Sequence, residues 1–200
     1  MVVKNNRSSR AWEQRRNEIV DEAARLFAAN GYHATGVAEL GDAVGLGRGA
    51  LYYYIDSKEN LLTLIHDRVI VDVLAAGNAA MAMEAPATER LRSLGRDLVR
   101  IIAHYPDHVW VFLHEFKSLS GSAAEQFRSN RRSFENSIET ILISGVNEGA
   151  FKIANTRLTT LAWLGLHNYI YIWFRSGGSI TVEMIAENFS DIFLDGITIR

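Results

Sequence analysis

The chain has no cysteine among its 200 residues. Without cysteine it cannot form a disulfide, hold a metal ion through thiolates or use a thiolate as a nucleophile. The absence is compatible with a reducing compartment, and we expect the protein in the cytoplasm.

Signals for export and for membrane insertion are also lacking. The first residues contain no apolar stretch long enough for a secretory signal. The most apolar run, Leu158 to Phe174, is interrupted by two threonines, a histidine and an asparagine. It is shorter than the roughly 20 residues that a membrane-spanning helix needs, so we expect a buried helix of a soluble protein.

A strong charge of either sign is absent, since the formal net charge is −2. This excludes a protein that coats nucleic acid with its whole surface. The N-terminal segment is nevertheless basic, because a single acid, Glu13, stands among Lys4, Arg7, Arg10, Arg15 and Arg16. A local basic patch on a nearly neutral protein indicates one surface for phosphate, with a solvated tail as the alternative explanation.

The apolar residues recur at spacings of three and four, which is typical of helices, and no segment alternates like a convincing strand. With 48% apolar residues, the chain can bury one good core or two small cores that share an interface. We therefore predict an all-α protein with about nine helices. Their expected bounds are Arg10–Asn30, Val37–Val44, Arg48–Tyr54, Lys58–Met83, Ala87–His104, Asp107–Leu119, Ala123–Glu148, Thr156–Arg175 and Thr181–Gly196.

The segment GLGRGALYYY, residues 45–54, allows two interpretations. Gly45, Gly47 and Ala50 fit the G-x-G-x-x-G/A pattern that binds dinucleotides, but that pattern requires a preceding buried strand. The preceding residues have helical spacing instead, so this interpretation fails and no cofactor is expected. Two short helices joined by a glycine-containing turn match a helix-turn-helix unit, and Gly45 suits the left-handed conformation of such a turn.

A helix-turn-helix places its second helix in the major groove of DNA. Inward packing of the apolar positions leaves Arg48, Gly49, Tyr52 and Tyr53 on the outer face of that helix. The arginine can donate to guanine or phosphate, the tyrosine hydroxyls can donate to phosphate, and the glycine allows a close approach. Lys58 adds positive charge at the start of the next helix, where backbone N–H groups already favour phosphate.

Residues 19–62, IVDEAARLFAANGYHATGVAELGDAVGLGRGALYYYIDSKENLL, resemble the DNA-binding domain of the tetracycline-repressor (TetR) family of transcriptional regulators. The spacing holds across the whole segment and is carried by Ala24, Leu26, Phe27, Gly31, Tyr32, Thr35, Ala43, Gly45, Gly49, Leu51, Tyr52, Ser57, Lys58 and Glu59.

The resemblance implies an all-α dimer whose C-terminal body binds a small molecule. It also implies that Thr35 or Gly36 contacts DNA together with Arg48, Tyr52, Tyr53 and Lys58. We accordingly predict a helix-turn-helix domain with a basic arm over residues 1–57, and an effector-binding and dimerisation domain over residues 58–200.

Three glycines depart from the family pattern. Gly47 replaces the usual serine or threonine cap of the second helix, Gly36 replaces a common hydroxyl residue, and Gly41 stands where alanine is common. Glycine is a tolerable cap, but inside a helix it costs roughly 1 kcal/mol relative to alanine. These glycines support a rival interpretation, a small-molecule-binding helical protein with a degenerate head that does not bind DNA.

Large apolar side chains between residues 105 and 134 predict the effector site, because ligand pockets are mostly apolar with a few polar anchors. Ordinary core packing is the alternative explanation. The segment WFRSGGSIT resembles the family branch that controls fatty-acid and steroid breakdown, which implies a hydrophobic or acyl-CoA-like effector. The predicted contacts are Trp110, Leu113, His114, Phe116, Phe127, Arg131, Phe134, Asn168 and Tyr171.

The helix expected over Thr156–Arg175 is apolar almost all round, so more than one side of it must be covered. One side can face its own body and the other a second subunit, which predicts a homodimer through the last two helices. Two-fold symmetry would place the two recognition helices about 34–36 Å apart, one turn of DNA, or somewhat further. The predicted interface residues are Trp163, His167, Ile170, Phe174, Ile185, Phe189 and Phe193.

No catalytic or metal-binding constellation is apparent. His104 and His108 are four residues apart, but Pro106 between them interrupts the helix and no further ligands cluster nearby. We expect neither a metal site nor an enzyme, although a helical enzyme remains a second alternative. The predicted function is a homodimeric, ligand-responsive repressor that a small molecule releases from a palindromic DNA operator.

Overall fold

The structure, a computed structural model, describes residues 3–199, with side chains from Ser9 onward. This part of the chain forms ten α-helices, one 3₁₀ helix and a single isolated β-bridge, between Phe151 and Thr198. The predicted all-α class is confirmed. Among the residues described, no helix is both long and apolar enough to span a bilayer.

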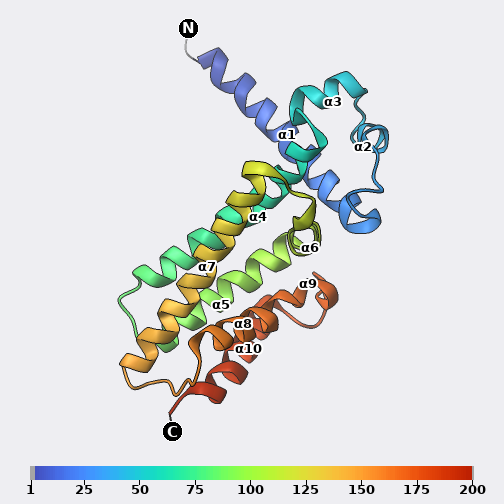
Figure 1. Cartoon of the computed structure of the whole chain (residues 1–200). Coiled ribbons are helices and arrows are strands. Elements are labelled where there is room, and N and C mark those ends of the chain that lie inside the picture. The colour runs from blue at the N-terminus through green and yellow to red at the C-terminus, as the bar shows by residue number, and fades with distance from the viewer. Residues whose placement is uncertain (1–2, 200) are drawn as a thin grey trace. The chain divides into compact units, whose positions relative to one another are not determined.

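The helices follow the predicted order (Figure 1). Three predictions of their extent were wrong. The first helix, expected to begin at Arg10, begins at Val3. The helix expected over Thr156–Arg175 is divided at Tyr169, and the one expected to reach Leu119 ends at His114 and is followed by a 3₁₀ turn. The bounds are α1 Val3–Asn30, α2 Val37–Val44, α3 Arg48–Ile55, α4 Lys58–Ala82, α5 Ala87–His104, α6 Pro106–His114, η1 Phe116–Ser118, α7 Gly121–Asn147, α8 Thr156–Asn168, α9 Ile170–Trp173 and α10 Val182–Ile197.

Local capping explains why the N-terminal helices begin and end where they do. Gly31 ends α1 at φ 86° and Gly45 ends α2 at φ 68°, both in the left-handed region that glycine adopts without strain. Ser57 caps α4, since its Oγ accepts a hydrogen bond of 3.0 Å from the backbone N–H of Asn60. The left-handed conformation predicted for Gly45 is confirmed, and the caps at Gly31 and Ser57 account for the predicted end of α1 at Asn30 and start of α4 at Lys58.

The chain packs as two compact units, which we call the head and the body. The head comprises the chain through Arg68 together with Asp107–Glu125, and the body comprises Val69–Pro106 and the chain from Gln126 onward. Helix α4 therefore contributes residues to both units. The functional division at residue 57 stays a prediction.

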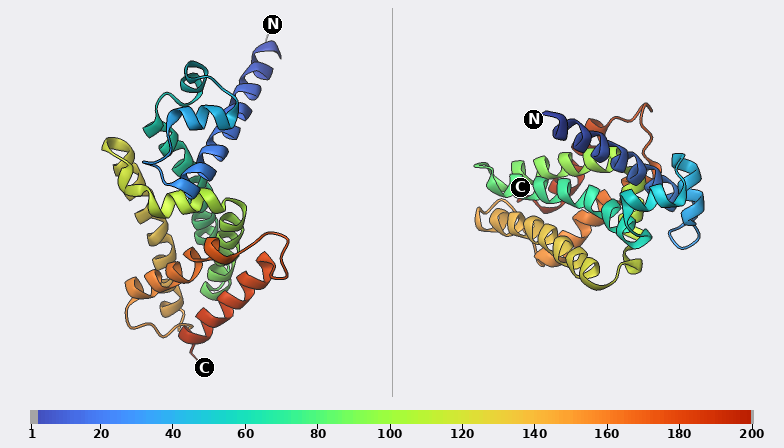
Figure 2. Two further views of the ribbon diagram at one scale, coloured as in Figure 1. Left: turned by 90° about the vertical axis from the view of Figure 1, so that its right-hand side faces the viewer. Right: turned by 90° about the horizontal axis from the view of Figure 1, so that it is seen from above.

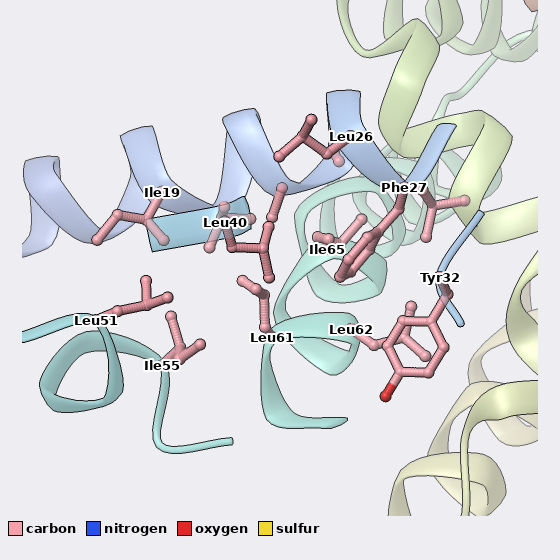
Figure 3. Packing of buried hydrophobic residues seen from close by; sticks show 14 residues of the cluster. Ile19, Leu26, Phe27, Tyr32, Leu40, Leu51, Ile55, Leu61, Leu62 and Ile65 are labelled. Atoms are coloured by element: carbon pink, nitrogen blue, oxygen red, sulfur yellow. The ribbon is translucent and has the colours of Figure 1, made fainter. Parts of the chain in front are cut away.

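The head has its own hydrophobic core (Figure 3). Side chains from the first four helices point toward one another there, and Phe27, Leu51 and Leu61 are completely buried. Val111, from the later segment of the head, joins the same core and is also fully buried. The helix-turn-helix is therefore supported by α1, by α4 and by α6.

The body is built around α5, which packs against α10, α8 and α9 (Figure 2). Gly95 allows the close approach of these helices, because a Cβ atom there would lie only 3.2 Å from His167 Nε2. Gly145 leaves room for the ring of Phe151 in the same way. Both glycines occupy the interior of helices for reasons of packing rather than flexibility.

Candidate nucleic-acid interface

Helix α3 has one buried face and one bare face. Leu51 and Ile55 are fully buried in the head core, whereas Arg48 and Gly49 are exposed and Tyr53 is 70% exposed. This alternation follows from helical periodicity, because the apolar residues lie four apart. Nothing in the described chain covers the outer face of the first turns of α3, which leaves it open to a partner.

Arg48 and Tyr52 are associated on this outer face. The Arg48 Cζ atom lies 5.7 Å from the centroid of the Tyr52 ring, within the range of a cation–π contact. Tyr52 is half-buried and packs partly against the head core. Its ring therefore restricts where the guanidinium can lie while leaving its donors accessible for a base edge or a phosphate.

An aromatic cluster between α1 and α3 was not predicted from the sequence. The Trp12 ring stacks on Tyr54 at 5.8 Å and meets Tyr53 edge-on at 6.4 Å. Arg16 lies over the Trp12 ring, with its Cζ atom 5.3 Å from the centroid. Trp12 thus supports the exposed tyrosine of α3, and the only signals for it in the sequence were the three consecutive tyrosines and one tryptophan in a basic segment.

The turn between α2 and α3 explains why Gly41 is present. A Cβ atom at Gly41 would lie 2.6 Å from the carbonyl oxygen of Leu46, closer than real Cβ contacts allow. The Leu46 N–H donates to the Gly41 carbonyl at 2.8 Å and closes the turn at this point. The glycine therefore permits the close packing of the turn, so it is no sign of a degenerate head.

A side-chain hydrogen bond also joins α1 to α2. A guanidinium nitrogen of Arg15 donates to the carbonyl of Val44, at the last residue of α2, and another bonds Glu18 at 2.8 Å. This arginine was predicted as part of a basic patch for phosphate. The structure uses its charge to cap the C-terminal end of α2, where a cation is favoured.

Thr35 was predicted as a possible DNA contact, and this prediction was wrong. Its side chain is fully buried, and its hydroxyl donates to the Gly31 carbonyl at 2.9 Å. Gly36, the other candidate, is exposed and begins α2 in an extended conformation. Of the two predicted residues, only Gly36 is therefore accessible, and it offers its backbone alone.

Lys58 does not extend freely into solvent as a phosphate contact would. Its ammonium donates to the Tyr32 carbonyl at 2.6 Å and lies 4.3 Å from the centroid of the Tyr32 ring. Partial burial lowers the pKa of Lys58, while Glu59 and Glu115 favour its charged form. The side chain is half-buried against the head rather than directed outward.

The basic N-terminal arm is only partly within the described side chains. Lys4 and Arg7 lie outside them. Arg10 is exposed beside a shallow groove along α1 that also contains Arg68 and several acidic and amide side chains, namely Glu13, Gln14, Asn17, Glu18 and Asp21. This stretch therefore carries charges of both signs. Among the described side chains, Arg10 is the exposed cation nearest the N-terminus.

The predicted effector residues fall into both units. Trp110, Leu113, His114 and Phe116 belong to the head. Trp110 packs against the head core and stacks on His114 at 4.6 Å, so packing explains this pair. In the body, Phe127 and Phe134 are buried, Arg131 bonds the buried Glu135 at 3.1 Å, and Asn168 and Tyr171 are half-buried.

The predicted dimer interface needs correction. Trp163, His167, Ile170 and Ile185 are buried inside the body of their own chain, so they cannot also meet a second subunit. The three phenylalanines, Phe174, Phe189 and Phe193, are half-buried. The apolar side chains that these helices leave exposed are Leu158, Leu161, Tyr169, Ile172, Trp173, Met184 and Ile192.

Metal-ligand clusters are absent from the residues that the structure describes, since no three His, Asp or Glu side chains lie close enough to share an ion. His104 ends α5 at the surface, whereas His108 is buried on α6, with its Nε2 3.1 Å from Asp21 Oδ1. The two histidines therefore do not form a pair. Burial lowers the pKa of His108, and Asp21 opposes that shift.

Two family models match the chain. One, for the tetracyclin repressor-like C-terminal domain, covers residues 84–197, and the other, for bacterial regulatory proteins of the tetR family, covers residues 19–65. The second contains α2, the turn and α3, together with the start of α4. The two matches therefore extend over most of the head and most of the body.

Relatives with known names are similar over nearly the full length. The transcriptional repressor KstR2 of Rhodococcus jostii is 30% identical over 190 residues, which is 92% of this chain and 91% of that protein. The solved structure of the ketosteroid regulator KstR2 of Mycobacterium tuberculosis has a TM-score of 0.87 at 25% identity and covers 93% of this chain and 96% of its own.

The solved structure of AibR in complex with isovaleryl coenzyme A and operator DNA has a TM-score of 0.79 at 24% identity, covering 89% of this chain and 97% of its own. At that identity the likeness shows the fold. Together with the family models and the KstR2 repressors, it leaves one conclusion: the chain belongs to the TetR family of DNA-binding transcriptional regulators.

Proposed function

We propose that this regulator is a homodimeric repressor that binds a palindromic operator through α3 and leaves it when a small molecule binds. The bare outer face of α3, with Arg48 and Tyr53 exposed above a fully packed core, carries the proposal for the DNA contact. Because it acts on DNA, we also propose that it works in the cytoplasm.

The residues proposed for DNA contact are Arg48, Gly49, Tyr52 and Tyr53, with the Gly36 backbone at the start of α2. Arg48 supplies donors for guanine or phosphate, and Tyr53 supplies a hydroxyl and a ring at groove depth. Gly49 has open space where a Cβ would lie, so α3 can approach the bases closely.

The proposed dimer contact is the exposed apolar stripe on α8, α9 and α10. Leu158 and Leu161 of α8, Tyr169 and Ile172 are each more than two-fifths exposed. Ile192 of α10 is 59% exposed, and α10 packs beside α8 within the body. Exposed apolar side chains gathered on neighbouring helices suit a protein interface, and a two-fold interface pairs the same surface on both subunits.

The proposed effector is a hydrophobic or acyl-CoA-like molecule bound in the body. Support comes from the name of the relatives, KstR2, described as a ketosteroid regulator, and from AibR, whose solved complex contains isovaleryl coenzyme A. A ligand that binds the DNA-free arrangement more tightly shifts the population toward it and weakens operator binding.

Operator binding by an Arg48→Ala variant tests the proposal. DNA fragments selected by the wild-type protein from a random pool would be bound by the variant about 10- to 100-fold more weakly, since a bidentate contact with a base is worth about 1–3 kcal/mol. Arg128→Ala, which removes an equally exposed arginine from the body, is the matched control and should retain wild-type affinity.

Failure of the wild-type chain to select any sequence would favour the rival function, a small-molecule-binding protein whose head does not bind DNA. Equal loss of affinity in both arginine variants would instead indicate a general charge effect, and would remove α3 from the interface.

A further inference from the structure

The backbone of Tyr32 is held from both sides. Its N–H donates to Glu115 Oε1 at 3.0 Å, and its carbonyl accepts from Lys58 Nζ at 2.6 Å. Tyr32 lies in the turn that connects α1 to α2. A carboxylate and an ammonium from two distant parts of the head therefore hold the two peptide groups that flank one residue in the connection to the helix-turn-helix.

Lys58 makes several contacts at this position. Its ammonium lies 4.3 Å from the Tyr32 ring centroid and 5.8 Å from that of Phe27. Hydrogen bonds with one charged partner are stronger than neutral ones, and the two rings add cation–π attraction. To reach a phosphate, the ammonium would have to give up all three contacts.

Glu115 comes from the segment that follows α6. The neighbouring Ser118 Oγ lies 3.0 Å from His33 Nε2, so the same segment fastens two successive residues of the α1–α2 turn. Val111, on α6 itself, is buried in the head core. The turn is therefore clamped between the start of α4 and the end of α6.

The clamp acts directly on α2. Thr35, three residues after Tyr32, donates its hydroxyl to the Gly31 carbonyl, and α2 begins two residues later at Val37. The backbone at Tyr32 therefore sets where the chain enters α2, and α3 follows α2 after one short turn. The contacts at Tyr32 act together with the head core and the Arg15–Val44 hydrogen bond in orienting α2 and α3.

We propose that Lys58 and Glu115 are positioning residues for operator binding, which hold the backbone on both sides of Tyr32 and do not themselves contact DNA. The proposal rests on the proposed function, since it concerns how α3 is presented to an operator. It assigns to Lys58 a role within the protein in place of the phosphate contact that the family resemblance implied.

The salt dependence of operator binding distinguishes the two roles of Lys58. A phosphate contact contributes about 0.9 to the slope of log K against log salt concentration. Lys58→Met should therefore weaken operator binding by roughly three- to tenfold, the worth of a lost hydrogen bond, while keeping the wild-type slope. Arg48→Ala is the comparison variant, and Lys58→Arg, which keeps a donor, should recover part of the affinity.

For Glu115, the direction of the change in operator affinity distinguishes a charge effect from a positioning role. Removing a negative charge from a DNA-binding head should strengthen operator binding if only charge matters. The positioning role predicts the opposite, so Glu115→Ala should bind roughly three- to tenfold more weakly. Its Tyr32 amide should also exchange with solvent faster than in the wild type. The operator affinity of Glu115→Gln, which keeps an acceptor oxygen, should lie between those of the wild type and Glu115→Ala. Glu115→Gln takes the place of Glu115→Ala in the test if the alanine variant does not fold.

The outcomes separate this proposal from the proposed function. If the wild-type chain does not bind an operator, the proposed function fails. If it binds, a drop of about 2 in the salt slope of Lys58→Met, which removes one lysine from each subunit of the dimer, overturns the positioning role of Lys58. Unchanged or stronger binding by Glu115→Ala or Glu115→Gln overturns the role of Glu115.

Discussion

Two exposed helix faces of this chain differ in chemistry. The outer face of α3 carries glycine, arginine and tyrosine, whereas the exposed face of α8 carries leucine and that of α10 carries methionine and isoleucine. Both faces lie opposite well-packed residues of the same helix, such as Leu51 on α3 and Trp163 on α8. Exposure alone therefore does not tell what a face contacts.

The side chains on each face indicate the kind of partner. Small and hydrogen-bonding groups suit a polar, charged partner that must be approached closely, which describes a DNA groove. Aliphatic groups suit a surface that excludes water, which describes another protein subunit. Substitutions on each side of this comparison should therefore affect different measurements, and we rank them by the size of the expected effect.

The largest effect should come from charge on the apolar face. In a Leu161→Glu, Ile192→Glu double variant, the proposed dimer should weaken by roughly two to three orders of magnitude, since an unpaired buried charge costs about 3–5 kcal/mol. Sedimentation velocity over a range of concentrations would measure the change. Operator affinity should fall with it, because two recognition helices no longer bind together.

Val71→Glu is the matched control for this variant. Val71 is 63% exposed on α4, as exposed as Leu158 of the proposed interface, but it lies on another helix. Its variant should stay dimeric. A double variant that also stays dimeric would remove the apolar face of α8 and α10 from the interface.

A smaller effect should come from Gly41→Ala. Helix propensity alone predicts that alanine stabilises α2 by roughly 1 kcal/mol, but the added Cβ would lie 2.6 Å from the Leu46 carbonyl oxygen. Overpacking typically costs about 1–3 kcal/mol, so we expect a net loss in the free energy of unfolding, measured in urea without DNA.

Gly49→Ala is the companion of that variant, since nothing lies within 4 Å of a Cβ at Gly49. It should leave the head as stable as the wild type or stabilise it by up to about 1 kcal/mol, while weakening operator binding. Stabilisation by both alanines would contradict the packing argument for Gly41.

The smallest effect should come from two buried histidines, one in each unit. Burial lowers the pKa of His66 in the head and of His167 in the body from 6.5 to about 4. The unfolded chain therefore binds protons more readily than the folded one below pH 6.5. Stability is fully present above that pH and is lost as the pH falls toward 4, by about 1 kcal/mol per histidine at pH 5.5.

His167→Gln should remove the part of the stability loss at low pH that comes from His167 in the body. The His167 Nδ1 lies 2.8 Å from the Trp163 carbonyl and therefore carries the proton, which a glutamine amide can replace as donor. Urea unfolding at pH 7.5 and 5.5 would compare the variants, with exposed His104→Gln as the control. If His167→Gln lost as much stability in acid as the wild type, burial of the ring would not be the cause.

Local features of the head were predictable from the sequence. Gly31 and Gly45 can adopt the left-handed conformation without strain, and the Ser57 hydroxyl can accept from the first turn of a helix, so the ends of α1 and α2 and the start of α4 were predicted correctly. The spacing of Leu51 and Ile55 likewise predicted which side of α3 is buried. Such signals are carried by a few adjacent residues.

Features that depend on contacts between distant parts of the chain were not predictable from the sequence. Helix α8 has apolar residues on every side, so periodicity could not tell Trp163, which meets its own body, from Leu161, which is exposed. The positive charge of Lys58 at the N-terminal end of α4 suggested a phosphate contact, but its ammonium donates to the Tyr32 carbonyl instead. No glycine or proline marked the break at Tyr169. In each case the outcome depends on a partner far away in the chain.

One consequence concerns hybrid regulators, in which the DNA-binding end of one protein is joined to the sensor of another. Because Val111 and Glu115 complete the core and the first turn of the head, a junction at residue 57 would place a foreign N-terminal segment on this chain's own 107–125 stretch. A hybrid that exchanges both stretches as a matched pair keeps those contacts intact.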